Sequence, residues 1–393
     1  MEEWKKYKMS DFIDFNPTVS LKKGTVARKI TMDKLIPHSR DIYDWEYEPY
    51  SGGSKFQNGD TIMARITPCL ENGKHAFISL LNDGETAYGS TEYIVMRGIP
   101  GISDNRFVYY LSHFPDFKNA AVKSMVGSSG RQRAQVDVLK NLEFYLPGLK
   151  EQRKIADTLS TLDDKIALNN RINHNLEEQA QALYRSWFVD FEPFKDGRFV
   201  ESELGFIPEG WRVGSIYDIC EIYYGAPFNS TLFNTEKKGL PLIRIRDLAK
   251  QEAGVFTEER HIKGQLTHKG DVLVGMDGEF SIYIWGGVDS WINQRISRFT
   301  PKPGISHYFL TETLRPQLKA VESSEVATTV IHIGKNDYDK FLAIIPPQRV
   351  MDSFYHVSEP LFLQYVENLS SNHSLSESRD ILLPRLMSGQ LTC

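Results

Sequence analysis

The side chains best suited to bind a ligand by their type and spacing lie in one short segment, residues 123–133. A loop of small residues is followed there by three long polar side chains, in the order Gly127, Ser128, Ser129, Gly130, Arg131, Gln132 and Arg133. Serine hydroxyls and backbone N–H groups suit phosphate oxygens, whereas arginine and glutamine can form paired hydrogen bonds with guanine and adenine. We therefore predict that this loop binds DNA, although a Gly-Ser loop is also compatible with an ordinary solvated turn.

A second segment, residues 325–335, offers a different set of side chains and lacks the arginines. Its candidate DNA ligands are two hydroxyls and two basic groups, Thr328, Thr329, His332 and Lys335. If both segments bind DNA, we expect them to recognise different sequences. Four isolated basic residues are further candidates, each equally compatible with an ordinary surface charge: Arg65, Lys74, Arg244 and Arg246. The last two are expected to lie on a strand and point to the same face, because alternate strand residues do so.

The sequence lacks the motifs of the common catalytic and metal sites. Gly334-Lys335 is followed by Asn336 and does not form a Walker phosphate loop, and neither a Gly-x-Gly-x-x-Gly nor a His-Glu-x-x-His motif occurs. Pro346-Pro347 precedes Gln348 and not an aromatic residue, so the pattern of an amino-methyltransferase is also missing. The three cysteines are too widely spaced for a metal cluster or a disulfide framework. We therefore expect a binding protein that has no catalytic residues and binds neither metal nor cofactor itself.

Length and composition are those of a globular protein with two domains. The 393 residues are 41% apolar and 25% charged, which suits two domains of roughly 150 residues with connecting elements. Neither a membrane span nor a secretory signal is recognisable, so we expect a cytoplasmic protein. The net charge of −5 argues mildly against nucleic-acid binding, but one basic groove can coexist with acidic faces, and partner subunits can neutralise phosphates.

The elements that must position the candidate residues occur twice, because the chain contains an internal repeat with an offset of about 200 residues. Trp4 matches Trp211, and a Gly-Asp turn precedes an apolar strand at both Asp60 and Asp271. Further along, a Leu-Pro or Ile-Pro pair is followed in both copies by Gln-Arg, at residues 146–153 and 345–349. Four matches in the same order are difficult to explain by chance. We therefore predict an α+β fold of two similar globular domains with mixed β-sheet cores, related by a pseudo-two-fold repeat.

A long helix is predicted after each copy of the repeat. Residues 151–187 contain neither proline nor glycine, and their apolar residues alternate between four- and three-residue spacing, which is the pattern of a coiled coil. At 1.5 Å per residue this helix would be roughly 55 Å long, which is too long for a compact core and suits a spacer. The C-terminal segment shows a similar pattern, although Pro360 and Pro384 should make it less regular.

Polar residues interrupt both helical patterns at matching positions, where Asn169 and Asn173 correspond to Gln364 and Asn368. Such residues cost stability but select the register and partner of a helix. We therefore predict that the two helices separate the domains and pair as an antiparallel coiled coil; the alternative is that each helix packs on its own domain. The residues predicted to face the partner helix are Ile155, Leu159, Leu162, Ile166, Asn169, Asn173, Leu176, Leu183, Phe354, Val357, Leu361, Gln364 and Asn368. The predicted boundaries are 1–148 for the first domain, 149–191 for the first helix, 192–346 for a linker and the second domain, and 347–393 for the second helix.

Several longer motifs in this arrangement are typical of one protein family. They are Gly127 through Arg133, Leu146 through Ala156, Leu183 through Pro193, Leu204 through Trp211, and Leu382 through Leu391. With these motifs the chain resembles, over essentially its full length, the specificity subunit of type I restriction-modification systems. It departs from the family pattern before the second helix, where a Leu-Pro-Pro-Leu-x-Glu-Gln-Arg-like segment is shortened to residues 345–349.

The resemblance implies a non-catalytic subunit with two target-recognition domains, each of which reads one half of a split, asymmetric DNA target. It also implies that the paired helices set the length of the unread gap and dock two methyltransferase subunits, which bind S-adenosylmethionine and methylate adenine. Restriction subunits would be optional further partners. Two alternatives remain at this point: an adaptor that assembles proteins without binding DNA, and an enzyme with an unrecognised active site.

Overall fold

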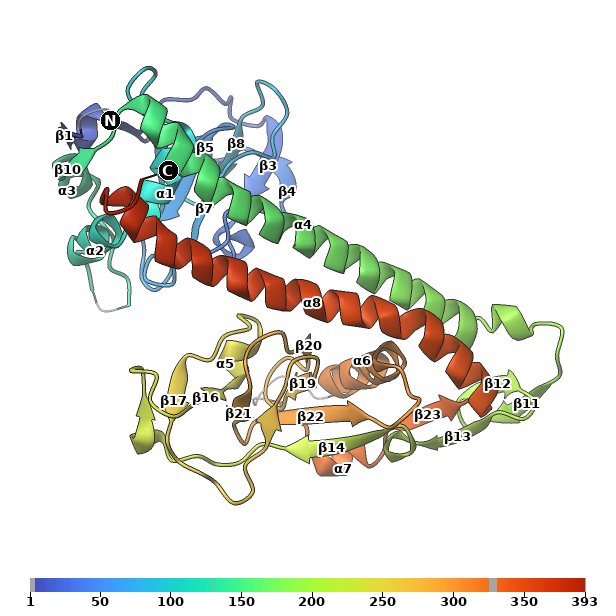
Figure 1. Ribbon diagram of the computed structural model, residues 1–393. Helices are drawn as coiled ribbons and strands as arrows, with labels where there is room; N and C mark the ends of the chain where they lie inside the picture. The colour runs from blue at the N-terminus through green and yellow to red at the C-terminus, as the bar shows by residue number, and fades with distance from the viewer. Residues whose placement is uncertain (1–3, 129, 325–330, 393) are drawn as a thin grey trace. The chain divides into compact units, whose positions relative to one another are not determined.

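The computed structural model describes residues 4–128, 130–324 and 331–392, and the chain divides into two compact units (Figure 1). Unit 1 comprises residues 1–167 and 375–393, and unit 2 comprises residues 168–374. Each unit combines helices with one antiparallel and one mixed β-sheet, so the predicted two-domain α+β fold is confirmed. No helix in the described part of the chain is both long and apolar enough to cross a membrane.

Unit 1 is built on two four-stranded sheets. The first has the order β2 (Ile13–Phe15), β9 (Tyr93–Gly98), β6 (Thr61–Ala64) and β7 (His75–Phe77), and all its neighbours are antiparallel. The second has the order β4 (Glu46–Pro49), β3 (Val26–Ile30), β8 (Ala87–Gly89) and β5 (Ser54–Phe56), with β3 and β8 parallel. The remaining elements are β1 (Lys5–Lys8), which pairs with β10 (Glu143–Leu146), and the helices α1 (Asn105–His113), α2 (Pro115–Lys123) and α3 (Val136–Lys140).

Unit 2 repeats this arrangement with different lengths. Its first sheet has the order β14 (Cys220–Tyr224), β22 (Ile296–Pro301), β19 (Val272–Gly275) and β20 (Ile282–Ile284). Its second sheet has the order β15 (Phe233–Asn234), β17 (Val255–Thr257), β16 (Leu240–Ile243), β21 (Ser290–Ile292) and β18 (Leu266–Thr267). The other elements are the pairs β11 (Phe199–Ser202) with β12 (Gly205–Pro208) and β13 (Arg212–Ser215) with β23 (Leu342–Ile345), and the helices α5 (Ile245–Leu248), α6 (His307–Ser324) and α7 (Lys335–Tyr338).

The register of the central strands defines which residues of the two units are equivalent. In unit 1, Ala64 of β6 pairs with Tyr93 of β9, and in unit 2, Gly275 of β19 pairs with Ile296 of β22. Both β6 and β19 are buried along their whole length, as expected for apolar strands with a neighbour on each side. The repeat predicted from the sequence is therefore present at the level of individual hydrogen-bonded pairs.

Helices α4 (Leu149–Phe188) and α8 (Gln348–Met387) contain 40 residues each, and α8 continues through Pro360 and Pro384. Within unit 2 they run antiparallel, because Asn169 Nδ2 donates to Asn372 Oδ1 (2.8 Å) and Asn368 Nδ2 donates to Asn173 Oδ1 (2.7 Å). Within unit 1, Ile155 and Leu159 of α4 share a core with Leu383, Leu386 and Met387 of α8. The polar residues therefore pair across the helices, while apolar residues of both helices also pack on the domain.

The predicted pairing pattern of α8 is wrong at two positions. Val357 is 52% exposed and Gln364 is exposed, whereas Ser358 and Phe362 are buried in their place. The reason is that this part of α8 packs on the start of α6. Ser358 hydrogen bonds with Ser306, the residue before α6 (2.6 Å), and the Phe362 ring stacks on His307 with centroids 4.0 Å apart. Burial consequently recurs every four residues along one helix face, and not in the alternating spacing of a two-helix interface.

The expectation that Arg244 and Arg246 share a strand face is also wrong. Strand β16 ends at Ile243, and Arg244 is the N-cap of the short helix α5. The Asp247 carboxylate accepts hydrogen bonds from the backbone N–H (3.0 Å) and Nε (2.8 Å) of Arg244. An acidic residue three positions after the cap stabilises a helical turn in this way, so the chain leaves the sheet before it reaches Arg246.

Candidate nucleic-acid interface

The loop predicted to bind DNA in unit 1 is a closed hairpin. Val126 and Arg133 exchange two backbone hydrogen bonds of 3.1 and 3.0 Å, and Arg131 N–H donates to the Ser128 carbonyl (3.0 Å) at the tip. Gly127 has φ +141°, and a Cβ there would lie 2.8 Å from the Arg131 carbonyl oxygen, so only glycine fits. The glycine therefore allows the tight turn that presents the polar side chains, while Ser129 lies outside the described residues.

The returning arm of the hairpin is joined to the end of β6. Thr67 N–H donates to the Gln132 carbonyl (3.0 Å), and Ala134 N–H donates to the Arg65 carbonyl (2.8 Å). The Arg65 side chain reinforces this junction, since its Nη2 donates to the Ala134 carbonyl (3.1 Å). Arg65 thus holds the base of the loop, whereas the Lys74 amino group donates to the Met32 carbonyl (2.8 Å) away from it.

The three long side chains of the loop differ in their availability. Arg131 is exposed, and neither its side chain nor that of Gln132 has a hydrogen-bond or ion-pair partner among the described residues. Arg133 is held by Glu92, whose carboxylate accepts from Nε at 2.9 Å and from Nη2 at 2.6 Å. Hydrogen bonding to Glu92 raises the pKa of the Arg133 guanidinium. Arg131 is consequently the loop cation most available to a phosphate or a base.

Unit 2 has the same junction with different side chains. Ile333 N–H donates to the Met276 carbonyl and Gly278 N–H donates to the Ile331 carbonyl, both at 3.0 Å. His332, between these bonds, lies 2.8 Å from Asp277 through its Nδ1 atom. Lys335 is the first residue of α7 and forms an ion pair with Asp339 (2.8 Å). The predicted residues Thr328 and Thr329 lie outside the described residues.

Sequence reasoning missed three charged residues at these junctions, namely Glu92, Asp277 and Arg295. Glu92 and Arg295 each directly precede a six-residue strand, β9 or β22. Extending the alignment of the two repeats to those strands would have shown that Glu92 and Arg295 occupy equivalent positions. Of the remaining predicted pair, Arg244 is the N-cap of α5 and Arg246 lies within that helix.

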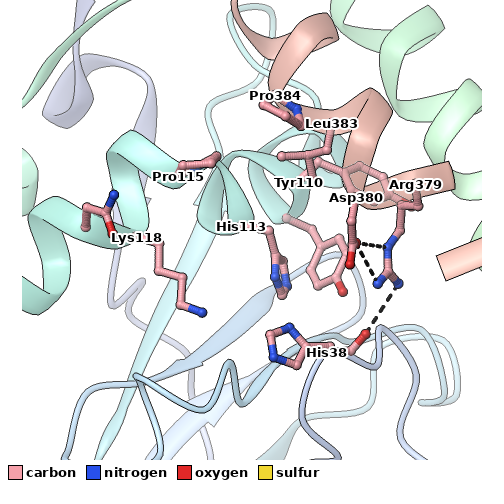
Figure 2. A pocket seen from close by; sticks show the side chains of 11 residues that line it. His38, Tyr110, His113, Pro115, Lys118, Arg379, Asp380, Leu383 and Pro384 are labelled. Carbon is pink, nitrogen blue, oxygen red and sulfur yellow. Dashed lines mark hydrogen bonds and ion pairs between the residues drawn. The ribbon is translucent and has the colours of Figure 1, made fainter. Parts of the chain in front are cut away.

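A cavity of about 320 Å³ lies elsewhere in unit 1. Figure 2 shows Arg379 of α8 beside Asp380 and above the backbone of His38, with His113 on the opposite wall. The Arg379 guanidinium donates to Asp163 (2.7 Å) and to the His38 carbonyl (3.3 Å). These bonds attach the end of α8 to the domain. No group of three or more residues in the described ranges could hold a metal ion.

The comparison with known protein families identifies this architecture. The model of the type I restriction modification DNA specificity domain matches residues 1–178 and 208–350. The type I restriction enzyme MjaIX specificity subunit of Methanocaldococcus jannaschii is 32% identical over 90% of this chain and 85% of its own length. The HindI specificity subunit of Haemophilus influenzae is 23% identical over the full length of both proteins.

A solved structure supports the fold independently of close sequence similarity. The S subunit of a type I restriction-modification system from M. genitalium aligns with 98% of this chain and 96% of its own, with a TM-score of 0.53 and 16% identity. The domain matches cover both copies of the internal repeat, which also present the equivalent loop junctions described above. The chain therefore belongs to the type I restriction-modification specificity subunits and is the non-catalytic DNA-recognition subunit of such a complex.

Proposed function

We propose that unit 1 and unit 2 each read one half of a bipartite, asymmetric DNA target. The first would use the loop at residues 126–133, and the second would use the segment that begins at Ile331. Exposed Arg131 and half-buried Gln132 in unit 1 are suited to guanine and adenine edges, while the loop N–H groups and Ser128 are suited to phosphate.

The observation that supports this proposal most strongly is the shared backbone junction. Met276 and Arg65 occupy equivalent positions after paired strands, and each carbonyl accepts a hydrogen bond from the returning arm of a loop. The side chains on this common backbone differ between the units, with Arg133 in one and His332 in the other. One scaffold with two sets of polar side chains is the arrangement expected for two different half-sites.

The helices α4 and α8 are proposed to set the spacing between half-sites and to dock two methyltransferase subunits. At 40 residues each helix is about 60 Å long, and the asparagine pairs within unit 2 select one register. S-adenosylmethionine would be bound by the methyltransferase subunits and not by this chain, and restriction subunits would be optional partners. The assembly would act on DNA in the cytoplasm.

The test is methylation of a randomised duplex library by the purified chain together with the methyltransferase subunit of its own system and S-adenosylmethionine. We expect methylation at a bipartite motif with a gap of constant length, and loss of methylation when the gap changes by one base pair. Methyltransferase without this chain is the control. Methylation without bipartite preference would refute the proposal.

Salt dependence separates this proposal from a protein-assembly adaptor. Affinity for DNA should fall linearly on a log–log plot as salt rises, because each phosphate contact releases counterions. If this chain were an adaptor that does not contact DNA, the salt dependence of the complex would equal that of the methyltransferase subunits alone.

A further inference from the structure

Three positions at the base of each loop are structurally equivalent in the two units. Arg65 N–H donates to the Glu92 carbonyl, and Met276 N–H donates to the Arg295 carbonyl, both at 2.9 Å. Glu92 and Arg295 therefore occupy the same place. The adjacent β-bridge joins Ile66 to Arg133 in unit 1 and Asp277 to His332 in unit 2. Asp277 is therefore equivalent to Ile66, and His332 is equivalent to Arg133. We call these sets, Ile66–Glu92–Arg133 and Asp277–Arg295–His332, the loop-base triads.

The triads contain opposite charges at equivalent positions. In unit 1 the cation is Arg133 on the loop arm, and the anion is Glu92 on the sheet side. In unit 2 the cation is Arg295 on the sheet side, its Nε lies 3.5 Å from Asp277, and the loop arm has His332. All five polar side chains are partly exposed, so a ligand can reach them. The charge at the position shared by Glu92 and Arg295 is thus opposite in sign in the two units, and the arginine lies on the loop arm in unit 1 and on the sheet side in unit 2.

The geometry of the unit 1 triad leaves Arg133 able to bind a base. A guanidinium has five N–H donors. Nε and Nη2 each use one on Glu92, and Nη1 uses one on the Arg131 carbonyl (3.2 Å). One N–H therefore remains on each terminal nitrogen. Two such donors match the O6 and N7 acceptors of guanine, and the bidentate ion pair fixes the plane of the group.

The unit 2 triad offers a different pattern of donors and acceptors. The 2.8 Å contact between His332 Nδ1 and Asp277 Oδ1 favours a proton on Nδ1, which leaves Nε2 as an acceptor. Arg295 Nη1 lies 3.2 Å from the same Nδ1 atom. With the proton on Nδ1, this nitrogen cannot also accept from Arg295, so the Nη1 donors remain available to a ligand beside the imidazole. A base with an amino group, adenine or cytosine, can donate to such an acceptor.

We propose that the loop-base triads are specificity-determining: Glu92 positions Arg133 against a guanine of the first half-site, and Asp277 positions His332 and Arg295 against a different base of the second. This inference rests on the proposed function. It adds named positioning residues, Glu92 and Asp277, which belong to the sheet side of each junction and not to the loop itself.

The experiment measures base preference at every position of both half-sites, using the complete complex and the methylation library. Arg133→Ala and Glu92→Gln should each reduce the preference at one position of the first half-site roughly ten- to hundredfold, and leave the second half-site unchanged. Glu92→Asp, which keeps the carboxylate, should restore part of the preference. Asp277→Asn should show the converse pattern, with only the second half-site affected.

Glu143→Gln is the matched control. Glu143 lies on strand β10 of unit 1, and its exposed carboxylate forms an ion pair with Lys6 of β1 (2.6 Å). This substitution should leave the base preference at both half-sites unchanged. Unchanged discrimination at the second half-site shows that the unit 1 variants are folded and assembled. A uniform loss of methylation without a change in base preference would assign the triad a structural role and overturn the inference. If the unsubstituted complex shows no bipartite preference, the proposed function fails as well.

Discussion

Replacing Arg379 with methionine should destabilise unit 1 more than any ordinary surface substitution. Arg379 is 8% exposed and Asp163 is 3% exposed, and their guanidinium and carboxylate groups lie 2.7 Å apart. Methionine retains most of the aliphatic volume of arginine, so the substitution mainly removes the charge. Asp163 would then remain buried with the Tyr110 hydroxyl as its hydrogen-bond donor (2.7 Å).

The expected magnitude follows from the burial of the pair. Removing one partner of a buried ion pair costs about 3–5 kcal/mol, because the other charge remains uncompensated. Replacing both partners, as in Asp163→Leu with Arg379→Met, should cost less, since apolar replacement of a whole pair is often neutral. In the double variant the Tyr110 hydroxyl would lose Asp163 and keep only the longer bond to Ser160 Oγ (3.4 Å), which costs at most about 1–3 kcal/mol. The double variant should therefore be more stable than the single Arg379→Met variant.

Hydrogen exchange of peptides from α1 and from the end of α8 is the appropriate assay. A protein with two units does not unfold in one two-state step, whereas exchange reports the free energy of opening at each segment. Arg385→Met, at an exposed position of the same helix, is the control and should change protection by less than about 0.5 kcal/mol. Equal protection in the Arg379→Met and Arg385→Met variants would refute the role assigned to the ion pair.

Two further predictions concern DNA binding and pH. Arg131→Ala should weaken binding to the first half-site by about 1–3 kcal/mol. It should not lower the melting temperature, because the Arg131 side chain has no partner within the described chain. Titration of labelled duplex at constant salt checks this, and unchanged affinity and preference would exclude Arg131 from the interface. Burial lowers the pKa of His75 to about 3, well below the ordinary 6.5 of an unfolded histidine. Between these values the unfolded chain binds a proton that the folded chain does not, so the stability of unit 1 should fall as pH falls below 6.5, by about 2 kcal/mol between pH 6.5 and 5. Hydrogen exchange of unit 1 peptides, corrected for the intrinsic exchange rate at each pH, should show a weaker pH dependence of protection in His75→Asn. An equal dependence in both proteins would contradict the assignment.

Elements governed by local pattern could be predicted closely from the sequence. The helix predicted at residues 149–191 is found at Leu149–Phe188, and the one predicted at 347–393 is found at Gln348–Met387. Asparagine residues at interrupting positions indicated antiparallel pairing, and Asn173 does bond with Asn368. Periodicity and turn residues are properties of neighbouring residues, which explains why they are readable without a structure.

Predictions that depended on a partner distant in sequence were less successful. The spacing of apolar residues alone does not distinguish whether Val357 faces the partner helix or the solvent. The packing of α8 on the start of α6 decides that Val357 is exposed. Arg244 and Arg246 alternate as strand residues do, but the Asp247 carboxylate starts a helix there. In both cases a tertiary or capping contact outweighs a weak local preference.

The sequence alone determined that the chain is a repeated recognition fold with long paired helices and a polar loop between residues 127 and 133. Only the tertiary structure decided which residue holds the side chain of Arg133, because Arg133 meets Glu92 across 41 residues of sequence and Arg295 takes the place of Glu92 in unit 2. Backbone register between β6 and β9 brings those residues together. No periodicity along the chain encodes this contact, since it arises from strand pairing and not from the spacing of neighbours.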